Sequence, residues 1–577
     1  MNSGKIDNQL NLAMDISNSV REKTVDLDTG FNREFQTWEL IVRYIGDLQS
    51  LADKYNFTYV ILMNQYAIIT IREDLIRQLA GEVQIIFIEM PKRLNYEVTN
   101  SLAVSCINSV QTSKTNLTGQ GVLVAIIDSG IDYYHPDFRN SDGTTRIIEI
   151  WDQTIQGNPP PGYATGTVYT REQIDSAIGT GNRFRALELV PSTDVSGHGT
   201  HVAGIACGGG KEGEVRYRGV AYESDILVVK LGTSESASYP NTAQLMQAIN
   251  YCIIKAEERN QPIAINISYG NNYGSHTGQS ILENFIDEVA TVWKTSICIG
   301  TGNEGATRTH TSGTLVQGEN VIVELPVAVS QFTFNLQLWK NFSDDFGIRL
   351  TDPTGKVATI SSNLIGTQRY DVGATELYVY YGNPLPSNQL QEIYMEFIPI
   401  NNFVTSGIWR IELSPRQISN GRYDFWLPSG SVLGRDTGFL RSVETTTLTI
   451  PSTAAFAITV GAYDGLTDSY AYFSGRGYTR NNQIKPDLVA PGVNITSTAP
   501  NGGYTERSGT SMATPFVTGS CALMMQWGIV QGNDPYLYGE KMKAFLIAGA
   551  RQLPIESVYP NPTLGWGALC VRNSLPI

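Results

Sequence analysis

The chain has 577 residues, of which 41% are apolar, and this length predicts a globular protein of about two to four domains. Its formal net charge of −14 disfavours nucleic acid and anionic membranes as partners. No run of about eighteen apolar residues occurs, so the sequence predicts no membrane-spanning helix. The start of the chain lacks the basic and apolar segments of a signal peptide, so we expect the cytoplasm or another route of export.

After an N-terminal extension (residues 1–35), residues 36–96 alternate between strand and helix patterns. Strands are predicted at residues 38–45, 57–63, 65–71 and 82–90, and helices at residues 46–55 and 72–80. This β-α-β-β-α-β order is typical of a small ferredoxin-like domain. The polar stretch "PKRLNYEVTNS" (91–101) that follows contains a proline and predicts a linker.

From residue 97 the pattern becomes that of an α/β domain. The apolar run "GVLVAIIDSG" (121–130) predicts a buried parallel strand with Asp128 at its carboxyl end. The runs "DILVVKL" (225–231) and "IAINISYG" (263–270) repeat the signal and alternate with helical stretches, which predicts a parallel sheet. The turn-rich segment 139–166 is expected to form a surface loop.

Residues 307–449 have a different pattern, with short alternating segments such as "FTFNLQLW", "EIYMEFIPI" and "GIWRIEL" separated by turns. This pattern favours a β-sandwich inserted into the α/β domain. The α/β domain would then consist of residues 97–306 and 450–577, the second part including the C-terminal tail.

The six cysteines are scattered and form no CxxC pair. In a chain of this length we expect buried, free thiols rather than a disulfide framework, and no cysteine metal site. They are Cys106, Cys207, Cys252, Cys298, Cys521 and Cys570.

Four short motifs together supply the groups that acyl transfer needs. "IIDSG" contains Asp128, "SGHGTHVAG" contains His198, "GTGNEG" contains Asn303 and "SGTSMATP" contains Ser511. A serine hydroxyl needs a base to remove its proton, and an imidazole base needs a carboxylate to orient it. An amide side chain, with a backbone N–H, can bind the oxyanion that develops.

Each residue also has a structural interpretation. Asp128 could cap a turn, His198 could be a polar residue at a helix start, and Ser511 could be a helix N-cap. The joint occurrence of four motifs in one order favours the catalytic interpretation. Asp194, just before "SGHGT", is interpreted as a solvated loop carboxylate.

The order Asp128, His198, Ser511 and the words around them resemble the subtilisin-like serine proteases, or subtilases. The resemblance implies a three-layer α/β domain and an N-terminal pro-domain removed by self-cleavage near Tyr96. It also implies a pocket for the residue preceding the scissile bond, and a strand at residues 230–236 that pairs with substrate. The pocket residues implied are Ser268, Tyr269, Gly270, Gly300, Thr301 and Gly302.

The phrase "FIEMPKRL" and the inserted, jelly-roll-like sandwich resemble more closely the clostridial Csp-type subtilases, a group that includes the germination proteases. That resemblance implies a pro-domain retained after cleavage and limited proteolysis as an activating step. It adds the bacterial spore to the expected locations. The segment "CGGGKEGEVRYRG" (207–219) stands where secreted subtilases have an asparagine-rich calcium loop, so we expect no metal or other cofactor.

The sequence therefore predicts a serine endopeptidase made as a self-processing zymogen. Its partners would be a protein or peptide substrate and its own pro-domain, with no nucleic acid or membrane. Two alternatives remain open: a catalytically silent scaffold of the same fold that acts by binding, and a protease whose cleft stays blocked by the pro-domain.

Overall fold

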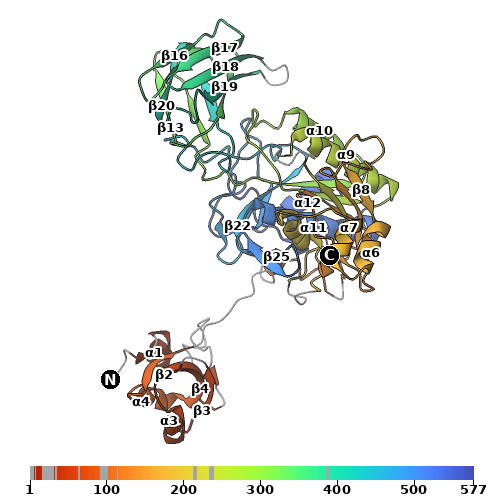
Figure 1. The fold of residues 1–577 in the computed structure, drawn as a ribbon, viewed down its shortest axis with the longest axis vertical. Helices are drawn as coiled ribbons and strands as arrows, with labels where there is room; N and C mark the ends of the chain where they lie inside the picture. Colours follow the sequence, from red (N-terminus) through yellow and green to blue (C-terminus); the bar gives the residue numbers. More distant parts are fainter. Residues whose placement is uncertain are drawn as a thin grey trace. The chain divides into compact units, whose positions relative to one another are not determined.

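The computed structural model describes residues 5–6, 8–15, 31–32, 35–62, 65–90, 102–112, 115–211, 217–232, 240–384 and 389–576. The chain divides into two compact units, Met1–Tyr96 and Glu97–Ile577, which are described in turn (Figure 1). None of the helices within the described ranges is long and apolar enough to cross a membrane.

The first unit is one antiparallel sheet with short helices. Its elements are α1 (Asn8–Asp15), β1 (Phe31–Asn32), β2 (Thr37–Tyr44), α3 (Leu48–Tyr55), β3 (Thr58–Leu62), β4 (Tyr66–Arg72), η3 (Glu73–Leu75), α4 (Ile76–Leu79) and β5 (Ile85–Glu89). Strand β4 lies between β2 and β3 and is antiparallel to both, while β5 pairs with β2. Alternate residues of β2 are buried, beginning with Trp38, Leu40 and Val42. The predicted β-α-β-β-α-β order is confirmed.

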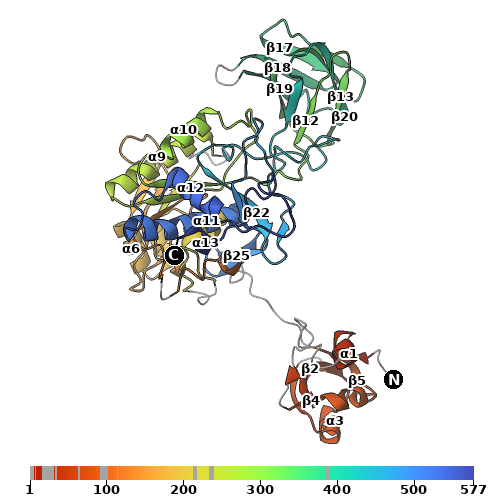
Figure 2. The same cartoon turned by 180° about the vertical axis from the view of Figure 1, so that it is seen from behind.

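A second sheet, largely parallel, forms the centre of the second unit (Figure 2). Its strand order is β23-β22-β11-β10-β6-β9-β7-β8, with β24 paired to β22. The bounds are β6 (Leu123–Asp128), β7 (Ile147–Asp152), β8 (Thr167–Thr170), β9 (Asp225–Lys230), β10 (Ile263–Ile267), β11 (Thr295–Gly300), β22 (Ile458–Asp464), β23 (Ser469–Tyr470) and β24 (Leu488–Pro491). The predicted α/β class is confirmed.

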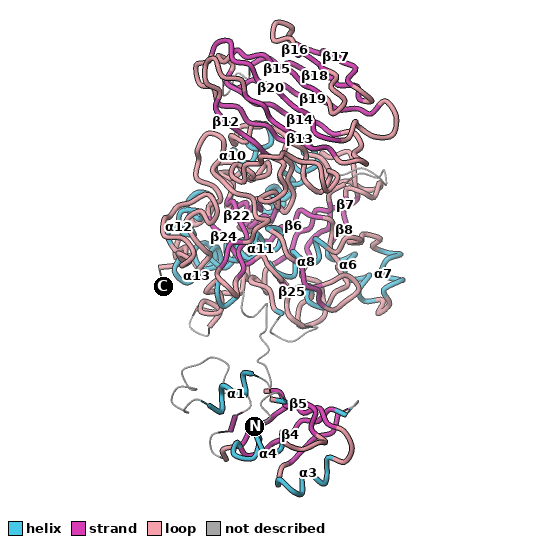
Figure 3. The backbone as a smooth tube through the Cα atoms, turned by 90° about the vertical axis from the view of Figure 1, so that its left-hand side faces the viewer, coloured by secondary structure: helices cyan, strands magenta, loops and turns pink. Residues whose placement is uncertain are grey.

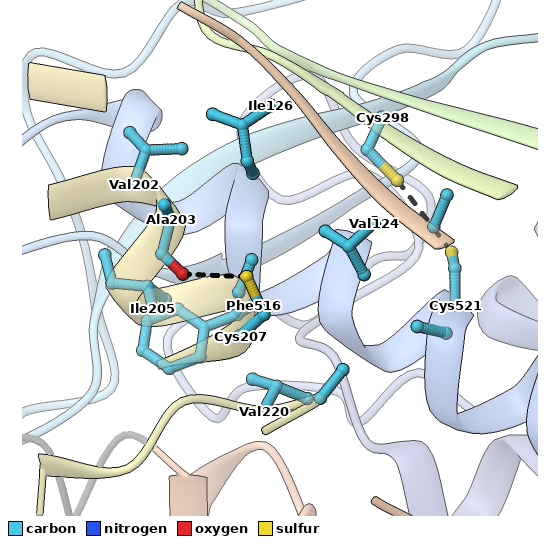
Figure 4. Packing of buried hydrophobic residues seen from close by; sticks show 14 of the residues in the cluster. Val124, Ile126, Val202, Ala203, Ile205, Cys207, Val220, Cys298, Phe516 and Cys521 are labelled. Atoms are coloured by element: carbon cyan, nitrogen blue, oxygen red, sulfur yellow. Dashed lines mark hydrogen bonds between the residues drawn. The ribbon is translucent and has the colours of Figure 1, made fainter. Parts of the chain in front are cut away.

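Helices cover both faces of this sheet. Those that bear on the site are α8 (His198–Cys207), α9 (Thr242–Glu258), α10 (Ile281–Val289) and α11 (Thr510–Met525). Val124 and Ile126 of β6 belong to the same buried cluster as α8 and α11, which Figure 4 shows from close by. Leu123, Ala125 and Ile127 belong to the cluster that contains α9 and α10. The alternation along one strand therefore produces the three layers, since successive side chains point to opposite faces.

The expected surface loop at residues 139–166 is wrong in its middle. Strand β7 lies there, pairs in parallel with β9, and has Ile147, Ile150 and Trp151 buried. This short apolar run is flanked by turn residues on both sides, and the flanks dominated the sequence pattern. After β7 the chain continues through β8 into helices α6 (Arg171–Gly179) and α7 (Arg183–Leu189).

The predicted β-sandwich is present as two antiparallel sheets (Figure 3). One has the order β12-β21-β14-β19-β18-β17 and the other β13-β20-β15-β16. Their side chains share a single apolar core that includes Trp409, Phe397 and Phe425. The strands are β12 (His310–Thr314), β13 (Val321–Val327), β14 (Phe334–Asn341), β15 (Asp345–Thr351), β16 (Val357–Ile360), β17 (Gly366–Val372), β18 (Thr375–Pro384), β19 (Leu390–Pro399), β20 (Gly407–Gln417) and β21 (Arg422–Trp426).

Buried aromatic and ionic contacts join the sandwich to the rest of the second unit. The ring of Trp426 stacks on His276 at 4.2 Å and on His310 at 4.8 Å between centroids. Beside this stack, Asp424 accepts from Arg480 Nε at 2.6 Å. The C-terminal part then contributes β25 (Ile495–Thr498), β26 (Tyr504–Arg507), the π-helical turn η6 (Gln526–Val530), α12 (Gly539–Ala548) and α13 (Val571–Ser574).

The expectation of six free thiols is wrong for two of them, because Cys106 and Cys570 form a disulfide. They are separated by 464 positions in sequence, so spacing gave no signal of the pairing. The remaining four, Cys207, Cys252, Cys298 and Cys521, are buried and free.

We expect the Cys106–Cys570 bond to stabilise the second unit. Replacing both residues by serine should lower the free energy of unfolding by about 2–4 kcal/mol, because the cross-link restricts the unfolded chain. Thermal unfolding with and without a reductant measures the effect. The double variant should no longer respond to the reductant, and an equal response in both proteins would contradict the assignment.

Candidate active site

The four motif residues lie at one edge of the sheet, where strands end and two helices begin. Asp128 ends β6, His198 begins α8, and Ser511 lies in the first turn of α11. Asn303 follows β11 by three residues. In parallel sheets, ligand-binding groups gather at the carboxyl ends of strands, and this edge carries all four.

His198 and Asp128 are in direct contact, with His198 Nδ1 2.7 Å from Asp128 Oδ1. The carboxylate is fully buried, whereas the imidazole is 27% exposed. Gly199 makes the approach possible, because a Cβ there would lie 2.1 Å from the carbonyl oxygen of Gly130. A larger residue than Gly199 would therefore prevent α8 from coming close enough for His198 to contact Asp128.

Two opposing effects act on the imidazole of His198. Burial alone would lower its pKa, but the charge of Asp128 and the hydrogen bond to it outweigh burial, so the pKa is raised from the usual value for histidine. A neutral imidazole held in this way has its Nδ1–H on Asp128 and its Nε2 lone pair free to accept a proton.

The interpretation of Asp194 as a solvated carboxylate is wrong, because its side chain is buried and fully bonded. Oδ1 accepts from Ser129 Oγ at 2.8 Å and from Gly197 N at 3.0 Å. Oδ2 accepts from the backbone N–H and the hydroxyl of Thr200 at 2.8 and 2.7 Å. Asp194 thus caps α8 and ties it to the residue after Asp128, which holds His198 in place.

Ser511 lies four residues before Pro515, which has no N–H to donate to the Ser511 carbonyl. The hydroxyl of Ser268 lies 3.5 Å from this carbonyl oxygen and supplies a weak substitute donor. Gly300 lets β11 pack against the same turn, since a Cβ there would lie 2.9 Å from Thr514 Oγ1. The backbone of the Ser511 turn is thereby held from two sides.

Asn303 has a fixed amide orientation. Its Oδ1 accepts from the backbone N–H of Thr510 at 3.0 Å and from the Thr510 hydroxyl at 3.3 Å. With the oxygen held by the start of α11, the NH₂ group is the part of the amide that is left to donate to a ligand. This is the arrangement that an oxyanion-binding asparagine needs.

A cavity of about 280 Å³ lies beside Ser511. Five of the six predicted pocket residues line it, together with Asn303 and Ser511: Ser268, Tyr269, Gly270, Gly300 and Gly302. Thr301 does not line it, because its side chain is fully buried and lies 3.3 Å from Ser474 Oγ. Of the predicted substrate strand, Lys230 ends β9 and residues 233–236 lie outside the described residues.

Six further residues line this cavity without having been predicted: Glu304, Thr307, Ser429, Ser431, Thr449 and Thr510. Ser429 and Ser431 follow the last strand of the sandwich and also line a larger, mainly apolar cavity of about 620 Å³. Ser429 and Ser431 are more than a hundred positions from Asn303, so the motifs gave no sign that they line the pocket. Glu304 lies inside "GTGNEG" but was not singled out. Across the described ranges, no group of three or more His, Cys, Asp or Glu side chains is arranged to hold a metal ion.

Comparisons with known proteins agree with this geometry. A model of the subtilase family matches residues 119–331 and 435–567, and a model of the Csp protease B prodomain matches residues 4–92. The solved structure of the Clostridium perfringens CspB protease is 38% identical, with a TM-score of 0.76. That similarity covers 82% of this chain and 96% of the other.

Curated relatives are more distant. The PI-type proteinase of Lactococcus lactis subsp. cremoris is 26% identical over 78% of this chain, and the minor extracellular protease Vpr of Bacillus subtilis (strain 168) is 25% identical over 79%. The chain spans about a quarter of the length of the lactococcal proteinase and 52% of Vpr.

Replacing Asp128 by asparagine should lower the pKa of His198, because the charge that outweighs burial is removed while the shape is kept. The ring signals of ¹⁵N-labelled histidine, followed by NMR from pH 4 to 9, would measure the change. With five histidines in the chain, His198→Gln assigns the signal. An unchanged pKa would contradict the dominant role given to Asp128.

Proposed function

The chain belongs to the subtilase family of serine endopeptidases, and from this membership we propose that it hydrolyses peptide bonds through an acyl-enzyme on Ser511. The observation that carries the proposal is that one edge of the sheet holds both the Asp128–His198 pair, in contact at 2.7 Å, and an Asn303 amide fixed against the start of the helix that carries Ser511.

In the proposed reaction, His198 Nε2 takes the proton of the Ser511 hydroxyl as the oxygen attacks the substrate carbonyl. Asp128 holds the tautomer and stabilises the imidazolium that forms. The oxyanion is bound by the Asn303 NH₂ group and the backbone N–H of Ser511. His198 then returns the proton to the leaving amine, and a water molecule releases the acyl group by the same steps.

We also propose that the N-terminal unit is a pro-domain cut off by the enzyme itself. The match to the CspB prodomain supports this role, and the division of the chain after Tyr96 makes a cut there reasonable. The predicted cut near Tyr96 falls in residues 91–101, outside the described residues. The domain limits 36–96, 97–306, 307–449 and 450–577 are part of this proposal, as is retention of the pro-domain after cleavage.

The biological role that we propose is limited proteolysis of a protein substrate, as in the activation of a hydrolase during spore germination. The 38% identity to a CspB protease supports this role, and the jelly-roll description of the sandwich belongs to the same proposal. A silent scaffold is less favoured, because all the residues of the acyl-transfer site are present and His198 and Asp128 are in contact.

Ser511→Ala should abolish self-processing and peptide hydrolysis while leaving the fold intact, because only the nucleophilic oxygen is removed. Intact mass of the purified protein, wild type beside variant, is the measurement. We expect two pieces split near residue 96 for the wild type and one chain for the variant. Equal processing in both would refute the assignment of Ser511.

Asn303→Ala should lower kcat by about 10²–10³-fold with a smaller effect on KM, the range found for loss of one oxyanion donor in a related subtilase. Steady-state kinetics on a chromogenic peptide measure both constants. If kcat is unchanged in a folded variant, another group binds the oxyanion.

A further inference from the structure

We propose that Glu304 is a positioning residue of the substrate pocket. It fixes Ser429 and Gly430 and thereby residues 429–431, at the exit of the sandwich, which form the pocket wall that selects the residue preceding the scissile bond. This inference rests on the proposed peptidase function and deepens it.

The carboxylate of Glu304 holds the wall directly. Oε1 accepts from the Ser429 hydroxyl, and Oε2 accepts from Gly430 N at 3.0 Å. On its other side, Oε2 accepts from Thr307 Oγ1 at 2.7 Å and from Thr309 Oγ1 at 3.3 Å. One buried side chain, 6% exposed, therefore joins the start of the sandwich insertion to its end.

These four donors are three hydroxyls and one backbone N–H, and a carboxylate offers about four lone-pair positions. Oε2 accepts three of these donors and Oε1 accepts one, so most of the acceptor capacity of Glu304 is used within the protein. Hydrogen bonds to an ionised acceptor are stronger than neutral ones, which suits a group that holds a wall. Glu304 itself lines the cavity, so a substrate side chain there would meet a carboxylate that the wall already engages.

The wall belongs to both cavities. Ser429 and Ser431 line the 280 Å³ cavity beside Ser511 and the 620 Å³ apolar cavity next to it, as do Tyr269 and Gly270. The same segment is anchored at its base, where Leu427 N donates to Thr309 O at 2.9 Å and its carbonyl accepts from Asn272 Nδ2 at 3.2 Å. The sandwich thus reaches the substrate cleft through this segment.

If Glu304 acts through the wall, its loss should affect substrates of any charge. If it instead bound a basic substrate residue directly, its loss should affect that substrate alone. Three peptides that differ only in having Lys, Gln or Leu before the scissile bond separate these cases, assayed with the complete, processed protein.

Glu304→Gln keeps the volume and removes the charge, and Ser429→Ala removes one of the donors. We expect each to raise KM for all three peptides by about 2- to 10-fold, the equivalent of one net hydrogen bond, with little change in kcat. The KM of the double variant should be no higher than that of the more affected single variant, because both substitutions break the same hydrogen bond between Ser429 and Glu304. Glu319→Gln, exposed on the sandwich, is the matched control.

Ser431→Asp tests the wall without touching the Glu304 links. It should raise kcat/KM for the Lys peptide relative to the Gln peptide by about fivefold, the equivalent of one exposed ion pair. Loss of activity on the Lys peptide alone in Glu304→Gln, or additive effects in the double variant, would overturn the inference. A wild type that neither processes itself nor cleaves any of the peptides would overturn the proposed function, and the inference with it.

Discussion

The site depends on the close packing of α8 and α11 against the carboxyl ends of β6 and β11. A Cβ on Gly199 would clash with the backbone of Gly130, and a Cβ on Gly300 would lie 2.9 Å from Thr514 Oγ1 of α11. Without such close approaches, His198 could not reach Asp128 at 2.7 Å while Ser511 lies at the same edge. The glycines therefore set the distance between the helices and the sheet, on which the proposed site depends.

Three buried carboxylates in and around the cleft have different roles because their partners differ. Asp128 faces an imidazole and raises its pKa. Asp194 accepts only from backbone N–H groups and hydroxyls, so its charge is used to cap α8. Glu304 likewise accepts from hydroxyls and one N–H, but these belong to the two ends of the sandwich insertion. Burial gives each bond its strength, since water does not compete.

The inserted sandwich contributes residues to the pocket beside Ser511. It begins soon after Asn303, at β12, and its exit segment returns to the pocket beside Ser511. The stack of His276, Trp426 and His310 holds its base against the rest of the unit. The match to the subtilase family covers residues 119–331 and 435–567 and omits most of the sandwich strands. Ser429 and Ser431 lie in the unmatched part, so the inserted sandwich supplies this wall of the pocket.

The sequence by itself determined the fold class and indicated the four motif residues as candidates, because buried strands, helix starts and reactive side chains leave local patterns. It failed where local pattern and environment disagree: β7 lies between turn-rich flanks, and Asp194 looks like any loop carboxylate. Only the tertiary structure decided the Cys106–Cys570 pairing, the orientation of the Asn303 amide and the wall at Ser429. These depend on contacts between residues more than a hundred positions apart, and such contacts arise from packing, which no local pattern encodes.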